Sequence, residues 1–268
     1  MDKNITNFNT RLRTIRIRDL ILGFIACIVL CTIVALLAPI FEGDDYFIIL
    51  FFSIALLLFI WALRGTHGIK NNFEMLLEKD IQKEILYIFI INILFGYLFL
   101  FAFSAVDVLN GIIDPNWITM NDINTVNINS GMLILNAIVS IVLAPIVEEL
   151  TFRGVLFNRL KIRAGIIPAM IISSIIFAVG HEVGGITSAF LFGMCMCILY
   201  LKTDNILVPM SIHFLNNVFA TIMESTQLSS IVTQSALVFP SLLIAIIASI
   251  LLIKYIIKES KILKKKYS

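Results

Sequence analysis

The chain has 268 residues, of which 59% are hydrophobic and only 14% are charged. That apolar share exceeds the roughly 45–50% that is typical of soluble domains, so the composition excludes an ordinary soluble enzyme and predicts a polytopic membrane protein. The formal net charge of +2 gives no reason to expect a nucleic-acid partner.

Eight apolar stretches are long enough to form helices across a hydrocarbon core of roughly 30 Å. They predict an all-α fold with about eight transmembrane helices, in a single integral membrane domain over residues 1–268. The predicted helices are Leu20–Ile40, Tyr46–Leu63, Ile85–Val106, a segment from about Gly131 past Val147, Ile166–Val183, Ile186–Leu201, Ile206–Met223 and Leu237–Ile257.

Lysines and arginines gather in alternate connections, as the positive-inside rule requires. Five precede the first helix, four lie between the second and third, four follow the fourth, one follows the sixth and six lie at the C-terminal end, which accounts for all 20. The other connections carry acidic residues and no lysine or arginine. We therefore predict a multi-pass protein of the cell membrane with both termini cytoplasmic and a basic tail that contacts lipid headgroups.

Two connections are long enough to have structure of their own. Residues 64–84 mix charged and apolar residues at helical spacing, which predicts an amphipathic helix at the cytoplasmic membrane surface. Residues 107–129, rich in Asn and Asp, form a long external loop that either covers a site or is only a solvated connector.

Polar residues interrupt three of the predicted helices in pairs spaced four residues apart, which places both members of a pair on one helix face. The pairs are Glu149 with Arg153, Phe177 with His181, and His213 with Asn217. An ion pair between Glu149 and Arg153 would offset much of the cost of burying either charge. Glu148, about 100° around the helix from Glu149, is then the carboxylate that remains for other work.

The length of the fourth helix decides whether these groups can meet. If that helix stopped at Val147, Glu148 would lie near the inner surface, far from His181 on the next helix. If it continues to about Asn158 or Arg163, Glu148 and His181 both lie roughly 22 Å from the common turn, at about 1.5 Å per residue. His213 and Asn217 then reach a similar depth. The sequence thus favours a long fourth helix and one shared polar cavity.

A buried Glu beside a neutral His suits the activation of water, because an apolar environment makes the carboxylate a stronger base. Glu148 would take a proton from a water held by His181, and His213 and Asn217 would donate hydrogen bonds to the oxyanion. Each residue alone also fits a structural role, as a hydrogen-bonding group between helices. Ionisable groups at this depth are costly, so their occurrence together favours a functional site.

These residues resemble the motifs of the CPBP family of intramembrane proteases, which includes the type II CAAX prenyl proteases and the bacteriocin-processing and self-immunity proteins. The family signatures EExxxR, FxxxH and HxxxN appear as Glu148-Glu149-xxx-Arg153, Phe177-xxx-His181 and His213-xxx-Asn217, within about residues 131–220. The resemblance implies an eight-helix fold with an endopeptidase site in the membrane. It implies that Glu148 and His181 activate water, that His213 and Asn217 stabilise the oxyanion, and that Glu149, Arg153 and Phe177 support the site.

Members of this family are often described as metalloproteases. Glu148, His181 and His213 could supply the two-His, one-Glu ligand set of a catalytic zinc. The zincin motif HExxH is absent, because Gly185 stands where its second His would be. We favour metal-independent glutamate chemistry with no cofactor, and zinc is the alternative.

Two further functional classes are compatible with buried Glu, His and Arg. A transporter is disfavoured by the absence of repeat symmetry and of a second carboxylate-bearing helix. A non-catalytic membrane adaptor or bacteriocin-immunity protein would not need Glu148. For a protease, the partner is a membrane-associated peptide or protein: a prenylated CAAX protein, a pheromone precursor or a bacteriocin leader. A composition rich in Ile, Asn and Lys, typical of low-GC bacteria, favours a peptide precursor; the oligomeric state stays open.

Overall fold

The computed structural model describes residues 5–38, 44–113, 130–181, 185–226, 228–233 and 235–267. Within these ranges the regular secondary structure is helical, apart from one isolated bridge between Asn7 and His67. The predicted all-α class is therefore confirmed.

The helices fall into two groups, before and after residues 114–129. The first group is α1 (Phe8–Thr14), α2 (Ile17–Leu37), α3 (Asp44–Leu63), α4 (Ile69–Leu76), α5 (Lys79–Gly96) and α6 (Leu98–Ile113). The second group is α7 (Ser130–Ile138), the π-helix η3 (Val139–Leu143), α8 (Ala144–Glu149), the π-helix η4 (Leu150–Phe157), α9 (Asn158–Ala164), α10 (Ile166–Val179), α11 (Ile186–Thr203), α12 (Leu207–Ser225), α13 (Leu228–Val232) and α14 (Ser235–Tyr267).

Each of the eight predicted transmembrane segments contains a helix, and in the described part of the chain six helical segments are long and apolar enough to cross a membrane. The two that miss this standard are α10, which has only 14 residues, and α12, whose apolar face is interrupted by polar side chains. The predicted third helix is longer than expected, since α5 and α6 together form an apolar segment over Lys79–Ile113. The fifth helix is shorter at its end than the predicted Ile166–Val183, because α10 stops at Val179.

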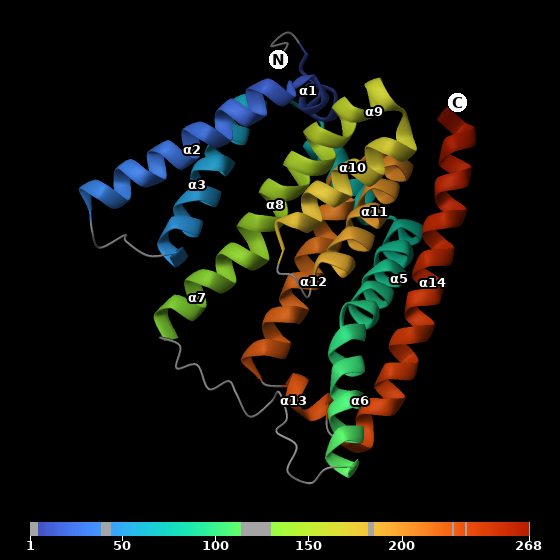
Figure 1. The fold of residues 1–268 in the computed structure, drawn as a ribbon. Helices are drawn as coiled ribbons and strands as arrows, with labels where there is room; N and C mark the ends of the chain where they lie inside the picture. Colours follow the sequence, from blue (N-terminus) through green and yellow to red (C-terminus); the bar gives the residue numbers. More distant parts are fainter. Residues whose placement is uncertain are drawn as a thin grey trace.

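One long helix, from α7 to α9, crosses the molecule diagonally (Figure 1). On one side, α3 packs against α7, η3 and α8, and α2 packs against α3. On the other side lie α10, α11 and α12, followed by α5, α6 and α14, which pack against one another. Both chain termini lie at the same end of the molecule (Figure 1).

The fourth predicted helix continues past Glu148 to Ala164, as one shared cavity would require. It ends at Gly165, which joins α9 to α10 with φ +81, a backbone conformation that residues with a side chain rarely adopt. The helices α9 and α10 therefore run in opposite directions from the same turn. Glu148 and His181 can lie at the same depth, as predicted.

Of these helices, α11 is at the centre of the bundle, since every residue from Phe192 to Leu201 is buried. By contrast, only 11% of the apolar window of α2 and 17% of that of α3 are buried inside the molecule. A hydrophobic helix with so little contact to protein fits a lipid environment. The protein is thus a multi-pass membrane protein.

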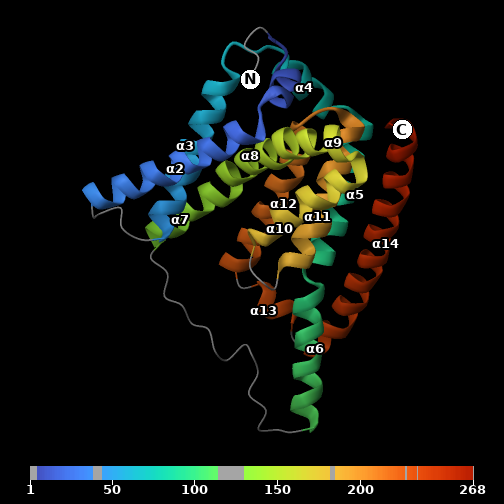
Figure 2. The same ribbon diagram turned by 45° about the horizontal axis from the view of Figure 1, so that its top comes forward.

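The structure describes all of the first predicted long connection and only part of the second. The predicted amphipathic segment contains α4, at the end of the molecule that holds the termini (Figure 2). The buried amide of Asn205 holds this helix by donating to the carbonyl of Asn72 at 2.7 Å. Of the predicted external loop, residues 107–113 belong to α6, and residues 114–129 lie outside the described residues.

Candidate active site

The two glutamates lie in α8, a short α-helical segment between the π-helices η3 and η4. Wide π turns inside α-helices occur frequently at functional sites, and they leave backbone carbonyls without their usual partners. Two of these carbonyls accept hydrogen bonds from other helices: Ser140 O from Asn217 Nδ2 at 2.6 Å, and Phe152 O from Ser173 Oγ at 3.1 Å. These bonds fix the glutamate-bearing helix to α12 and α10.

A third side chain donates hydrogen bonds to the backbone of η4. Asn158 Nδ2 donates to the carbonyls of Arg153 at 3.0 Å and Gly154 at 2.9 Å. The same amide lies 3.1 Å from the hydroxyl oxygen of Tyr200 on α11. The sequence patterns did not single out Asn158, because the irregular turn that it serves has no signature of its own.

Glu149 is at the centre of a buried polar cluster. Its Oε1 atom accepts from Arg153 Nη1 at 2.9 Å, and both side chains are almost fully buried. The same oxygen lies 3.0 Å from Nδ1 of His213 on α12. The predicted pair of Glu149 and Arg153 is therefore present, and it also holds the imidazole of His213.

Glu148 faces the other nitrogen of the same imidazole. Its Oε2 atom lies 3.7 Å from Nε2 of His213, and 22% of the Glu148 side chain is exposed. We assign the Nδ1 proton of His213 to the bond with Glu149, so that Nε2 is the nitrogen directed toward Glu148.

The ring of Phe177 contacts the side chains of three other site residues. Its centroid lies 4.6 Å from that of His181 and 5.9 Å from that of His213. The guanidinium carbon of Arg153 lies 4.4 Å from the same centroid, close enough for a cation–π interaction. The predicted neighbours Phe177 and His181 are thus in contact, and the Phe177 carbonyl lies 3.0 Å from His181 Nδ1.

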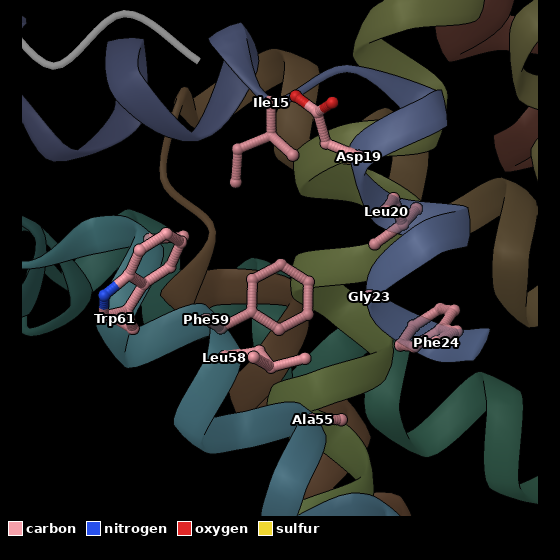
Figure 3. A pocket seen from close by; sticks show the side chains of 10 residues that line it. Ile15, Asp19, Leu20, Gly23, Phe24, Ala55, Leu58, Phe59 and Trp61 are labelled. Atoms are coloured by element: carbon pink, nitrogen blue, oxygen red, sulfur yellow. The ribbon is translucent and has the colours of Figure 1, made fainter. Parts of the chain in front are cut away.

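A cavity of about 350 Å³ lies elsewhere, between α2 and α3, and contains none of the predicted site residues (Figure 3). Its lining is apolar, with Phe59 of α3 opposite Leu20 of α2, and Asp19 is the one charged residue among the described residues that line it. Apart from Asp19, this lining offers no groups for acid–base chemistry.

The polar residues meet at a different cavity, of about 240 Å³, which His181, His213 and Asn217 line together. Glu148 is not part of this lining and reaches the cavity through its contact with His213. Four further polar residues line it that the sequence motifs did not identify: Asn92, Tyr97, Ser188 and Asn216. Asn92 had a usable signal, as a lone amide in an apolar segment.

Glu148, His181 and His213 are the possible zinc ligands of the alternative mechanism. Among the residues that the structure describes, no group of three or more His, Cys, Asp or Glu side chains is arranged to hold a metal ion. One ring nitrogen of His213 already contacts Glu149, and one of His181 contacts a backbone carbonyl.

Comparisons with known proteins agree with the motifs. Residues 130–219 match the family model described as Type II CAAX prenyl endopeptidase Rce1-like. A Bacillus subtilis (strain 168) protein named "Putative membrane peptidase YdiL" is 34% identical over 91 residues, which are 34% of this chain and 37% of that relative. No solved structure matches the chain. The matched segment contains every candidate site residue, and these similarities agree with the resemblance of this part of the chain to the CPBP family of membrane proteases.

Proposed function

We propose that the protein is an intramembrane endopeptidase that hydrolyses a peptide bond of a membrane-associated peptide or protein. The single observation that carries this function is the contact of His213 with both Glu148 and Glu149 beside a cavity that His181 and Asn217 also line. Burying charged groups inside a membrane is costly, so such groups are rare and their presence on two helices marks a functional site. The similarity to membrane peptidases supports the same reaction class.

In the first step, Glu148 removes a proton from a water that His181 helps to hold, and the water oxygen bonds to the carbonyl carbon. Glu148 suits this role better than Glu149, because one oxygen of Glu149 already contacts both Arg153 and His213. Glu148 is also the more accessible of the two, with 22% of its side chain exposed against 0% for Glu149.

In the second step, the tetrahedral oxyanion accepts hydrogen bonds from His213 and Asn217. His213 donates from Nε2, the ring nitrogen that faces Glu148. Asn217 uses one amide proton for Ser140 O and has a second for the oxyanion. The C–N bond then breaks, and the proton held by Glu148 passes to the departing amine nitrogen.

We propose that this chemistry needs no metal. The arrangement of the side chains supports this view, since a zinc site would need both rings and Glu148 to converge on one point, and among the described residues no such group of His, Cys, Asp or Glu is found. The test is to dialyse the purified protein against a zinc chelator. Unchanged cleavage is expected, and loss of cleavage that added zinc restores would show a metalloprotease.

The test of the function compares released and membrane-bound peptides, by mass spectrometry, from cells that express the native chain or Glu148→Gln at equal levels. A peptide fragment that is lost only in the variant is expected, because glutamine is nearly isosteric but cannot act as a base. The matched control is Glu74→Gln on α4, which makes the same chemical change away from the cavity.

The same experiment identifies the substrate class and tests the adaptor alternative. We propose that the substrate is a peptide precursor, such as a pheromone or bacteriocin leader. A product that carries a prenylated cysteine would instead identify a CAAX protein as the substrate. Identical peptide profiles in all strains, with the cellular phenotype intact in Glu148→Gln, would overturn the protease and favour a non-catalytic adaptor or immunity protein.

A further inference from the structure

A second polar cavity lies at the end of the molecule that holds both termini. It measures about 480 Å³, and four arginines dominate it while no acidic residue is among the described residues that line it. The lining consists of Arg16, Ile17 and Arg18 at the start of α2, and Arg159, Ile162 and Arg163 of α9.

The charges in this cavity are only partly balanced. Arg18 has the carboxylate of Asp19 at 3.7 Å, but 73% of the Arg18 side chain is exposed, so this pair is weak. Arg159 is fixed in place, because its Nε donates to the carbonyl of Ile15 at 2.8 Å. An excess of positive charge remains, and the N-terminal end of the 21-residue helix α2 adds to it.

Guanidinium groups bind phosphate oxygens in pairs, through parallel hydrogen bonds. Arg159 and Arg163 are four residues apart and so present two such groups from one face of α9. Arg16 and Arg18 approach from α2. The cavity therefore has the donors that a phosphodiester requires, on two helices that are far apart in the sequence.

The depth of the cavity matches that of lipid phosphates. The apolar span of α2 begins at Ile17, and the span that contains α9 ends at Ala164, so the arginines lie where both spans meet the interface. From Ile17, the residues Ile21, Ile25 and Ile28 follow on one face of α2, with exposed fractions of 52%, 51% and 48%. This stripe leads from the cavity into the hydrocarbon region.

We propose that the arginine cavity binds the phosphate of an anionic phospholipid, whose acyl chains lie along the stripe from Ile17 to Ile28. The lipid links α2, which has few contacts with the rest of the protein, to the end of the helix that carries Glu148 and Glu149. This site does not depend on the proposed proteolytic function.

The experiment measures lipid binding to the full-length protein in detergent by native mass spectrometry. Phosphatidylglycerol is the probe, and phosphatidylcholine is the zwitterionic control of the same chain length. Retention of phosphatidylglycerol at least about tenfold above phosphatidylcholine is expected. The variant Arg16→Gln/Arg163→Gln should lose that preference, since each basic residue near an anionic surface contributes on the order of a fivefold change in affinity.

The matched control, Lys261→Gln/Lys264→Gln, removes the same charge from the C-terminal end of α14 and should keep the preference. Equal retention of both lipids by the native chain, or equal loss in the control, would overturn the proposal. Competition by inorganic phosphate or glycerophosphoglycerol as effective as by the intact lipid would replace it by a free phosphate site. If the double variant does not fold, Arg163→Gln alone gives the same comparison, since this side chain is exposed at the end of α9.

Discussion

At the residue scale, two identical neighbours have opposite environments. Glu149 is completely buried and shares one carboxylate oxygen between Arg153 and His213, whereas Glu148 is partly exposed and contacts His213 at 3.7 Å. The positive charge of Arg153 has no exposure to water, so its stability depends on Glu149. Glu148 is thus the more accessible of the two, and Glu149 is the one that balances the buried charge of Arg153.

This difference predicts opposite effects of the same substitution. Glu149→Gln leaves the buried guanidinium of Arg153 without its counter-charge, and the free energy of unfolding should fall by about 3–5 kcal/mol. Glu148→Gln should change it by less than about 1 kcal/mol while abolishing cleavage. Thermal unfolding in detergent measures both. Equal loss of stability in the two variants would mean that Glu148 is also structural.

The sequence predicted contacts within one helix better than contacts between helices. The i,i+4 pairs of Glu149 with Arg153 and of Phe177 with His181 follow from helix geometry alone. The contacts of His213 with Glu149 and Glu148 join residues 64 and 65 positions apart, and no periodicity encodes them. Asn92 and Tyr97 reach the cavity from α5 and its C-terminal end by tertiary packing, which local patterns do not describe.

At the element scale, the irregular helix from η3 to η4 depends on its neighbours. Side chains of α10 and α12, and Asn158, supply the hydrogen bonds that wide turns lack. The helix α1 also packs on it, with the buried Leu12 directly against Gly154. Because Gly154 follows Arg153, the position of α1 is coupled to that of the buried ion pair.

The close contact of Leu12 with Gly154 can be tested by a rescue experiment. A Cβ atom at Gly154 would lie 2.7 Å from Leu12 Cδ2, so Gly154→Val should destabilise the protein by about 1–3 kcal/mol or more. Leu12→Ala makes room, and the double variant should be more stable than the sum of the single effects by at least about 1 kcal/mol.

Gly111 on α6 is the matched control for this pair. A Cβ atom there meets no other atom within 4 Å, so Gly111→Val should show no coupling with Leu12→Ala. Thermal unfolding of the five variants, three single and two double, gives the coupling energy of each pair. Additive effects of Gly154→Val and Leu12→Ala would contradict the packing of α1 against η4.

At the scale of the whole molecule, the polar residues of the site lower the hydropathy of the helix that carries them. The helix α12 fails the apolar standard for a span because it carries His213, Asn216 and Asn217, the residues that line the cavity. The prediction of about eight spans came from apolar stretches, and the alternation of positive charge supports that count independently of hydropathy. The structure agrees with that alternation, since the two termini and α4 lie at one end and the end of α6 lies at the other (Figures 1 and 2).

The predicted orientation, with both termini cytoplasmic, can be measured by cysteine labelling in intact cells. The native Cys27, Cys31, Cys195 and Cys197 are all buried, so their reaction with a charged maleimide should be slow. New cysteines are placed at Lys70 on α4, at Lys261 on α14 and at Ile113, which is 81% exposed at the end of α6. Because Lys and Arg mark the cytoplasmic side, Ile113→Cys should react in intact cells, and Lys70→Cys and Lys261→Cys only after the membrane is permeabilised. Reaction of Lys261→Cys in intact cells would reverse the orientation and place the arginine cavity at the outer surface.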